Sequence, residues 1–261
     1  KGLKFIHGTN KFNLGRLYQW TTLNLNMKPY HDEYKVMGLS PYGDVQKSVK
    51  LSKILNKYFK VHKKKFVIEF KSKPKDMYYF FKKIYNNFRF DEVAGGLQHL
   101  IEKLLSEWVF KLTSKYRNRS EIFYGGGVAM NVKSNLAISK IKKIKKFFVP
   151  LSPADETNVL GALYMMIEKD YLQKNKSLKK IPSLSSPYLG MEYNSYNINS
   201  IKKYIGQGKV NILKLEKVAQ DLNKGKIIAR FSGRSEFGQR ALGNRSILAS
   251  PIYKNIQNKI N

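Results

Sequence analysis

The chain has 261 residues, a length that allows one large domain or two of ordinary size. It is 42% hydrophobic and 13% aromatic, which excludes a disordered charge carrier, and the absence of cysteine excludes disulfides, thiolate metal sites and cysteine nucleophiles. No apolar run is long enough for a transmembrane helix, and the first residues lack the apolar centre of a signal peptide, so we expect a cytoplasmic protein.

The formal net charge of +31 has two interpretations. A strongly basic surface is typical of nucleic-acid-binding proteins, because lysines neutralise phosphates. The lysines are dispersed over nearly the whole chain, however, and dense runs are confined to "VHKKKF" and "KIKKIKKFF". This distribution favours a compositional bias towards lysine, and we do not expect nucleic acid as a partner.

The first part of the chain alternates between helical patterns and loops. The stretch "KFVIEF" has the composition of a strand, and apolar spacing predicts helices at residues 11–27, 76–88 and 91–116. Residues 28–44, "KPYHDEYKVMGLSPYGD", are rich in Pro and Gly and are predicted to form a loop. Glu33 could hydrogen-bond a ribose there and Lys35 could contact a phosphate, although an ordinary solvated loop would carry the same residues.

The centre of the chain has an α/β pattern. Alternating strand and helix signals predict strands at 120–124 and 145–150 and helices at 131–140 and 158–173. Three glycines in "YGGGVAMN" follow the first strand and would let backbone N–H groups approach a phosphate or nucleoside. Tight strand-to-helix turns also use glycine for steric reasons alone, so the motif by itself is not specific.

The polar segment "SPADETNVLGAL" follows the second of these strands. Its Asp155 could ligate a hard metal ion or cap the next helix, and capping is the commoner role of such a residue. The metal interpretation depends on the neighbouring strand, which carries the glycine turn to the same edge of the sheet. The four histidines show no HxxH, HxxxH or HExxH spacing, so a self-contained histidine metal site is unsupported.

Residues 174–187, "KNKSLKKIPSLSSP", are polar and aperiodic and are predicted to be a linker. Beyond the linker, the pattern predicts a helix at 195–205, a strand at 209–215, a helix at 216–225 and a strand at 226–232. The chain lacks an initial Met and stops within a helical pattern, so we expect a portion of a longer protein.

Arginine is concentrated in one short segment. The chain has 41 Lys and only 8 Arg, and four of the eight arginines lie in "RFSGRSEFGQRALGNRSILASP", residues 230–251. Arginine offers a planar fork for carboxylate or phosphate that lysine cannot copy. Three glycines spaced five residues apart would let the segment wrap an anion. The alternative is a structural network between the arginines and Glu236, and we favour the anion site.

These segments together resemble the NodU-type O-carbamoyltransferases. The resemblance runs in order through "LGRLYQWTTLNL", "EYKVMGLSPYG", "YGGGVAMNVKSN", "PADETNVLGALY" and "GRSEFGQRALGNRSILASP". It implies an α/β protein in which the second lobe of an actin/sugar-kinase-like (ribonuclease H-like) ATPase fold is followed by part of a YrdC-like domain. The implied domains are 1–173, incomplete, the linker 174–187, and 188–261, also incomplete.

The resemblance also implies a two-step reaction. The YrdC-like part would activate carbamoyl phosphate with ATP to carbamoyl adenylate, and the ATPase-like part would transfer the carbamoyl group to a hydroxyl of a sugar-like or natural-product acceptor near a divalent iron. Two alternatives stay open: a tRNA threonylcarbamoyl-modification enzyme, and a non-catalytic polyanion-binding module. The sequence identifies neither the acceptor nor the oligomeric state.

Site residues carry over from the resemblance position by position. Those implied for the nucleotide are Glu33, Lys35, Gly126, Gly127 and Asn131, and Asp155 would be the carboxylate ligand of the iron. Those implied for the carbamoyl-phosphate or ATP phosphates are Arg240, Arg245 and Ser246, with Arg234 and Glu236 nearby.

Four departures from the family accompany this resemblance. The family's HxxxH metal pair and its downstream "REPFRPFAP"-type segment are missing, so we expect this portion alone to lack full turnover. Gln239 stands where the family usually has Pro, and Ser250 where it usually has Asp.

Overall fold

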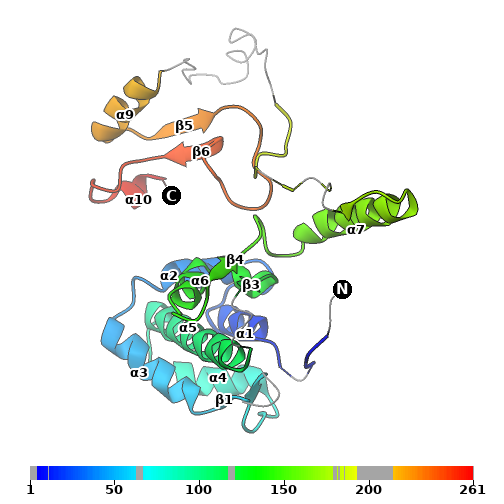
Figure 1. Ribbon diagram of the computed structural model, residues 1–261. Helices are drawn as coiled ribbons and strands as arrows, with labels where there is room; N and C mark the ends of the chain where they lie inside the picture. Colours follow the sequence, from blue (N-terminus) through cyan, green and yellow to red (C-terminus); the bar gives the residue numbers. More distant parts are fainter. Residues whose placement is uncertain are drawn as a thin grey trace. The chain divides into compact units, whose positions relative to one another are not determined.

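The chain forms two compact units, Lys1–Asp155 and Glu156–Asn261, and each is described by itself. The structure is a computed structural model that describes residues 5–10, 12–62, 67–116, 121–178, 181, 183–184, 186–192 and 214–260 (Figure 1). No helix in these ranges is long and apolar enough to cross a membrane. The helix predicted at 195–205 and most of the strand predicted at 209–215 lie outside the described residues. The functional division at the 174–187 linker stays a prediction.

The first unit is mainly helical with two small sheets. Its elements are α1 (Gly15–Asn24), α2 (Glu33–Leu39), α3 (Val45–Asn56), β1 (Phe59–Val61), β2 (Ile68–Phe70), α4 (Met77–Tyr85), α5 (Phe90–Lys115), β3 (Glu121–Phe123), the 3-10 helix η1 (Gly127–Met130), α6 (Val132–Ser139) and β4 (Lys146–Phe148). The predicted helices and strands of this region are confirmed, with small shifts at their ends. The structure adds α3 and β1, for which the sequence pattern was ambiguous.

The prediction of a loop over residues 28–44 is wrong in its centre, where α2 forms. Helix α2 begins directly after Asp32, and Glu33 places a negative charge in its first turn, where the helix dipole favours it. Val36 of this helix is fully buried, and α2 packs against α5. Tertiary burial therefore stabilises a short helix whose Pro- and Gly-rich flanks suggested a loop.

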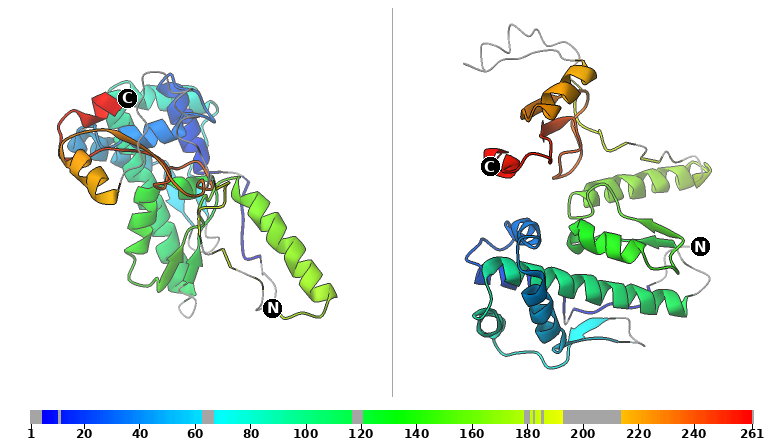
Figure 2. Two further views of the ribbon diagram at one scale, coloured as in Figure 1. Left: turned by 90° about the horizontal axis from the view of Figure 1, so that it is seen from above. Right: turned by 90° about the vertical axis from the view of Figure 1, so that its left-hand side faces the viewer.

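Helix α5 is the centre of the first unit. It has 26 residues, and α3 and α6 both pack against it (Figure 2). A Cβ added to Gly96 would lie 2.7 Å from Leu51 of α3, so the glycine allows the two helices a close approach. The buried side chains of α5 include Leu97, Leu100 and Leu104, which belong to one continuous hydrophobic cluster.

Strands β3 and β4 pair in parallel, with α6 as the crossover between them. In the register, Ile122 lies opposite Phe147 and Phe123 lies opposite Phe148. The first pair packs against the hydrophobic core, and the second pair is exposed. The strand–turn–helix–strand prediction is confirmed, and the carboxyl ends of both strands lie at one edge of the sheet. The protein is thus a mixed α/β protein with small sheets.

The second unit contains α7 (Thr157–Gln173), α9 (Leu215–Asn223), β5 (Ile228–Phe231), β6 (Arg245–Leu248) and α10 (Ile256–Ile260). Strands β5 and β6 pair antiparallel, so that Arg230 lies opposite Ser246 and Phe231 opposite Arg245. The predicted strand at 226–232 is confirmed, whereas β6 was not predicted. Residues 232–244, which connect the two strands, are called the arginine loop below (Figure 1).

Candidate functional site

The glycine turn, residues 125–127, lies open at the end of β3. A Cβ added to Gly125 or Gly127 would meet no heavy atom within 4 Å, so close packing does not explain either glycine. Gly126 has φ +102°, a conformation that other residues rarely adopt. Steric need therefore explains one glycine of the three, and the other two leave an uncovered backbone that a ligand could approach.

The loop that carries Asp155 lies beside the glycine turn. The backbone N–H of Gly126 donates to the carbonyl of Pro153 at 2.7 Å, which joins the two segments directly. The predicted proximity of the glycine turn to the segment containing Asp155 is therefore confirmed. The N-cap of α7 is Glu156, which makes no side-chain capping bond, so the structure does not support a capping role for Asp155.

The fit of this loop to a divalent iron is incomplete. Ser152 Oγ and both carboxylate oxygens of Glu156 are buried without a hydrogen-bond partner, so polar atoms near Asp155 are unsatisfied. Across the described part of the chain, however, no group of three or more His, Asp or Glu side chains could hold a metal ion. These residues do not form an iron site by themselves, and Asp155 stays a single predicted ligand.

Asn131, between η1 and α6, is part of a buried polar network. It is only 3% exposed. Its Nδ2 donates to Tyr18 Oη at 2.5 Å and to Gln98 Oε1 at 2.8 Å, and its Oδ1 accepts from Ser134 N at 2.9 Å and from Gln98 Nε2 at 3.1 Å. An amide side chain offers two donors and two acceptors, so all four are used. Asn131 therefore caps the start of α6 and ties it to α1 and α5, and its side chain is engaged internally.

The predicted residues Glu33 and Lys35 make contacts close by in sequence. Glu33 Oε1 accepts from the backbone N–H of Tyr30 at 2.7 Å, and Lys35 Nζ lies 2.9 Å from Asp32 Oδ1. A hydrogen bond from His31, together with those from Lys35 and the Lys28 backbone, holds the pKa of Asp32 well below its usual range. The Asp32 carboxylate raises the pKa of Lys35 in turn. Lys35 is thus a permanently charged amine held at the start of α2.

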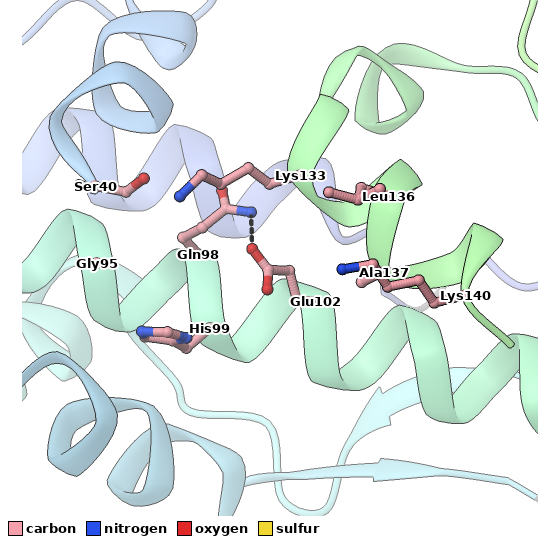
Figure 3. Close-up of a pocket in the computed structure, with 9 residues that line it drawn as sticks. All are labelled: Ser40, Gly95, Gln98, His99, Glu102, Lys133, Leu136, Ala137 and Lys140. Atoms are coloured by element: carbon pink, nitrogen blue, oxygen red, sulfur yellow. Dashed lines mark hydrogen bonds between the residues drawn. The ribbon is translucent and has the colours of Figure 1, made fainter. Parts of the chain in front are cut away.

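A cavity of about 340 Å³ with a mixed polar and apolar lining lies in the first unit between α5, α6 and the end of α2 (Figure 3). Gln98 Nε2 donates to Glu102 Oε1 at 2.7 Å, which connects this cavity to the Asn131 network. The lining residues are Ser40, Gly95, Gln98, His99, Glu102, Lys133, Leu136, Ala137 and Lys140. Sequence reasoning did not find the cavity, because its polar residues come from three helices and share no motif.

The arginine loop wraps a carboxylate that belongs to the loop itself. Glu236 Oε1 accepts backbone N–H bonds from Leu242 at 3.0 Å, Asn244 at 2.7 Å and Arg245 at 2.9 Å. These bonds, the Arg245 N–H first among them, lower the pKa of Glu236 to about 2. The sequence predicted an anion enclosed by the glycine-spaced loop, and the structure places Glu236 in that position.

Two of the four arginines hold the loop's carbonyl groups. The guanidinium of Arg230 donates to Gly243 O at 2.5 Å, and that of Arg245 donates to Ser232 O at 2.8 Å and Gly233 O at 2.9 Å. Arg245 also lies over the ring of Phe231, at 3.5 Å from the ring centroid. These contacts support a structural network, in which the link between Arg245 and Glu236 runs through the backbone N–H of Arg245.

The remaining predicted residues of this segment differ in their surroundings. Ser246 Oγ accepts from the Gly243 N–H at 2.8 Å, and Arg234 Nε lies 3.6 Å from Glu192 Oε2. Arg240 lies exposed in the turn between Glu236 and Leu242. The structure therefore groups Arg234, Arg240, Arg245 and Ser246 around one loop. This segment lies in the second unit, and the glycine turn lies in the first.

Comparison with known proteins identifies related chains. The family model described as Carbamoyltransferase N-terminus matches residues 2–164, and the model described as Carbamoyltransferase C-terminus matches residues 219–261. An uncharacterized protein of Methanocaldococcus jannaschii is 27% identical over 270 residues, covering 95% of this chain and 41% of that protein.

Two similar proteins carry informative names. Nodulation protein NolO of Bradyrhizobium diazoefficiens is 26% identical over 262 residues, covering 95% of this chain and 45% of that protein. Nodulation protein NolNO of Sinorhizobium fredii is 28% identical over 264 residues, covering 95% of this chain and 36% of that protein. The chain thus spans less than half the length of these relatives. Because the N-terminal family model alone covers more than half of it, the chain belongs to the carbamoyltransferase family represented by the NodU-type proteins.

Proposed function

We propose that the protein is an O-carbamoyltransferase that uses carbamoyl phosphate and ATP. Carbamoyl phosphate, ATP and water would give carbamoyl adenylate, pyrophosphate and phosphate, and an acceptor hydroxyl would then displace AMP and become a carbamate ester. Both family models support carbamoyl transfer in general. The ATP-dependent activation and a saccharide or other small hydroxyl acceptor are part of the proposal.

The glycine turn is the observation that carries the nucleotide part of this proposal. Gly125 and Gly127 lie in open space at the carboxyl end of a parallel strand, which is where ligands bind in α/β sheets. We assign the phosphates of the nucleotide to the backbone of this turn, and Asn131, which follows η1, would hold the start of α6 beside it. Glu33 and Lys35 would lie near the adenylate, with Lys35 supplying a fixed positive charge.

The arginine loop is assigned to carbamoyl phosphate or the ATP phosphates. Reactions of acyl phosphates depend on positioning and charge neutralisation, and guanidinium groups supply both. Arg240 would contact the anion, and Arg234, Arg245 and Ser246 would complete the surroundings. For the fold, we propose that residues 1–173 belong to an actin/sugar-kinase-like ATPase fold and residues 188–261 to a YrdC-like domain. Asp155 would be one ligand of a divalent iron, and none of the roles assigned above depends on that iron.

The nucleotide assignment is tested by titrating ATP into Gly125→Ala and Gly127→Ala variants. An added methyl group has space in the ligand-free turn, so thermal stability should change little, whereas a phosphate close to the backbone should be excluded. We expect at least one variant to bind ATP about tenfold more weakly, which corresponds to about 1.4 kcal/mol. The control is Gly161→Ala in α7, where the added Cβ also meets nothing within 4 Å.

If all three variants bind ATP as tightly as the wild type does, the nucleotide does not bind at the glycine turn. The reaction itself is tested by measuring ATP-dependent phosphate release from carbamoyl phosphate. The tRNA-modification alternative is tested by measuring tRNA binding over a salt series. True phosphate contacts would give an affinity that falls steeply as salt rises. A non-catalytic polyanion-binding module would bind polyanions but would not release phosphate from carbamoyl phosphate.

A further inference from the structure

The backbone N–H groups of the arginine loop are already engaged by an anion. Converging N–H groups in a loop are a common means of binding phosphate. Here Glu236 Oε1 takes up the N–H groups of Leu242, Asn244 and Arg245, all within 3.0 Å. A substrate anion at this loop would therefore be held by side chains, while the loop's own carboxylate holds the backbone.

The loop is closed by two sets of bonds with opposite polarity. Glu236 accepts from its N–H groups, whereas Arg230 and Arg245 donate to its carbonyls, at 2.5 Å to Gly243 O and 2.8 Å to Ser232 O. The flanking segment adds a third anchor, because Phe237 N donates to Pro187 O at 2.8 Å. The carboxylate joins Glu236 directly to Leu242, Asn244 and Arg245, and Asn244 Nδ2 adds a bond to Arg234 O at 2.8 Å.

Arg240 lies inside the part of the chain that this carboxylate closes. Residues 237–241 connect Glu236 to Leu242, whose N–H the carboxylate accepts. With both ends of this short stretch fixed, the position from which the exposed Arg240 side chain extends is fixed as well. Without the carboxylate, three backbone donors would turn to water and the stretch would gain conformational freedom.

We propose that Glu236 is the positioning residue of the arginine loop: its carboxylate fixes the turn from which Arg240 is presented to carbamoyl phosphate. This inference rests on the proposed function of the loop. In this proposal Glu236 does not contact the substrate and acts only by positioning Arg240. It also separates the arginines, because Arg230 and Arg245 maintain the loop while Arg240 binds the ligand.

The experiment compares Glu236→Gln and Glu236→Ala with Glu192→Gln in the protein. Glutamine keeps the length and one neutral acceptor, so it should preserve part of the loop, whereas alanine removes the contact. Glu192 is the matched control, because it is also near an arginine of this loop, at 3.6 Å from Arg234, but does not close the turn. Two readouts are needed: the rate of tryptic cleavage after Arg240, followed by mass spectrometry, and the KM and kcat of phosphate release from carbamoyl phosphate.

We expect cleavage after Arg240 to accelerate about tenfold in Glu236→Ala, less in Glu236→Gln, and not at all in Glu192→Gln. The KM for carbamoyl phosphate should rise about tenfold in Glu236→Gln, while kcat at saturation stays within about twofold of wild type. A residue needed only for folding would lower the amount of active protein, and therefore the apparent kcat, with an unchanged KM.

Unchanged cleavage and unchanged KM in Glu236→Ala would overturn the inference. A rise in KM of equal size in Glu192→Gln would also overturn it, because the effect would then come from charge near the loop rather than from closure of the turn. If the wild-type protein neither binds carbamoyl phosphate nor releases phosphate from it, the proposed function is wrong and the positioning role falls with it. Accelerated cleavage would in that case show only that Glu236 closes the loop.

Discussion

The glycine turn and the arginine loop are both rich in glycine, and the sequence suggested a ligand for each: a phosphate or nucleoside at the turn and an enclosed anion in the loop. The two regions are nevertheless built in opposite ways. In the turn, Gly125 and Gly127 have open space where a side chain would lie. In the loop, all three glycines have positive φ, and the enclosed N–H groups are bonded to Glu236. Glycine spacing thus indicates where the backbone bends sharply, but it does not reveal whether the backbone donors are available.

The difference suggests a division of tasks. The Cβ positions of Gly125 and Gly127 face open space, so a phosphate has room to approach the backbone of the turn, although the Gly126 N–H is bonded to Pro153 O. A loop that satisfies its own donors is held in one conformation and can present side chains with little further loss of conformational entropy. The first region is suited to backbone recognition of a nucleotide, and the second to recognition by a guanidinium group.

The largest effect should come from the buried Asn131 network, which follows the glycine turn in the chain. Asn131→Ala removes four hydrogen bonds, including the N-cap bond from Ser134 N at the start of α6, and leaves the buried Gln98 and Tyr18 with fewer partners. Unsatisfied buried polar groups and a lost helix cap together should lower the free energy of unfolding by about 3 kcal/mol. Urea denaturation measures this change. Asn158→Ala, at an exposed position at the start of α7, is the control and should change stability little.

A smaller effect should separate the three glycines of the turn. Gly126 has φ +102° and ψ 162°, a region essentially restricted to glycine, so Gly126→Ala should cost about 2 kcal/mol. Gly127→Ala has neither strain nor a close neighbour and should stay within about 0.5 kcal/mol of wild type. Thermal or urea unfolding of the two variants tests the comparison. Equal losses would mean that the turn is packed against something and is not open.

A still smaller effect is expected in the arginine loop for Arg245→Lys. Lysine keeps the charge but cannot donate to Ser232 O and Gly233 O at once, nor lie flat over Phe231. Part of the site is exposed, so the loss should be about 1 kcal/mol. Arg234→Lys is the matched control, because Arg234 makes a long, exposed ion pair with Glu192, at 3.6 Å. The stability of this variant should be close to that of wild type. Equal losses would show that Arg245 has no special structural role.

Much of the first unit was predictable because its signals are local. Apolar periodicity predicted α5 and α1, and the strand–glycine–helix pattern predicted β3 and α6. The parallel pairing then followed, since the α6 crossover returns the chain to the same sheet. Proximity of the glycine turn to the loop carrying Asp155 was predictable from that topology alone.

The errors arose where distant contacts decide the structure. Helix α2 depends on burial of Val36, and strand β6 depends on pairing with β5, so neither has a strong signal of its own. The internal engagement of Asn131 could not be predicted either, because Tyr18 and Gln98 are far away in sequence. For Glu236, the residue was noticed, but the sequence suggests a guanidinium as its partner, and backbone donors carry no residue-specific signal.

Acid should open the arginine loop locally and leave the glycine turn unaffected. The closed loop holds the pKa of Glu236 at about 2, below the usual 4.5 of glutamate. The ionised Glu236 carboxylate therefore stabilises the closed loop fully above about pH 4.5. This stabilisation is lost as the pH falls towards 2 and the carboxylate is protonated. Protection of the Leu242, Asn244 and Arg245 amides should therefore decrease about tenfold per pH unit in that range, as measured by hydrogen exchange relative to intrinsic rates. In Glu236→Gln, protection should be weak and independent of pH, and in the wild type the amides of α5 serve as the control. If protection of these three amides in the wild type does not depend on pH, the Glu236 carboxylate does not close the loop.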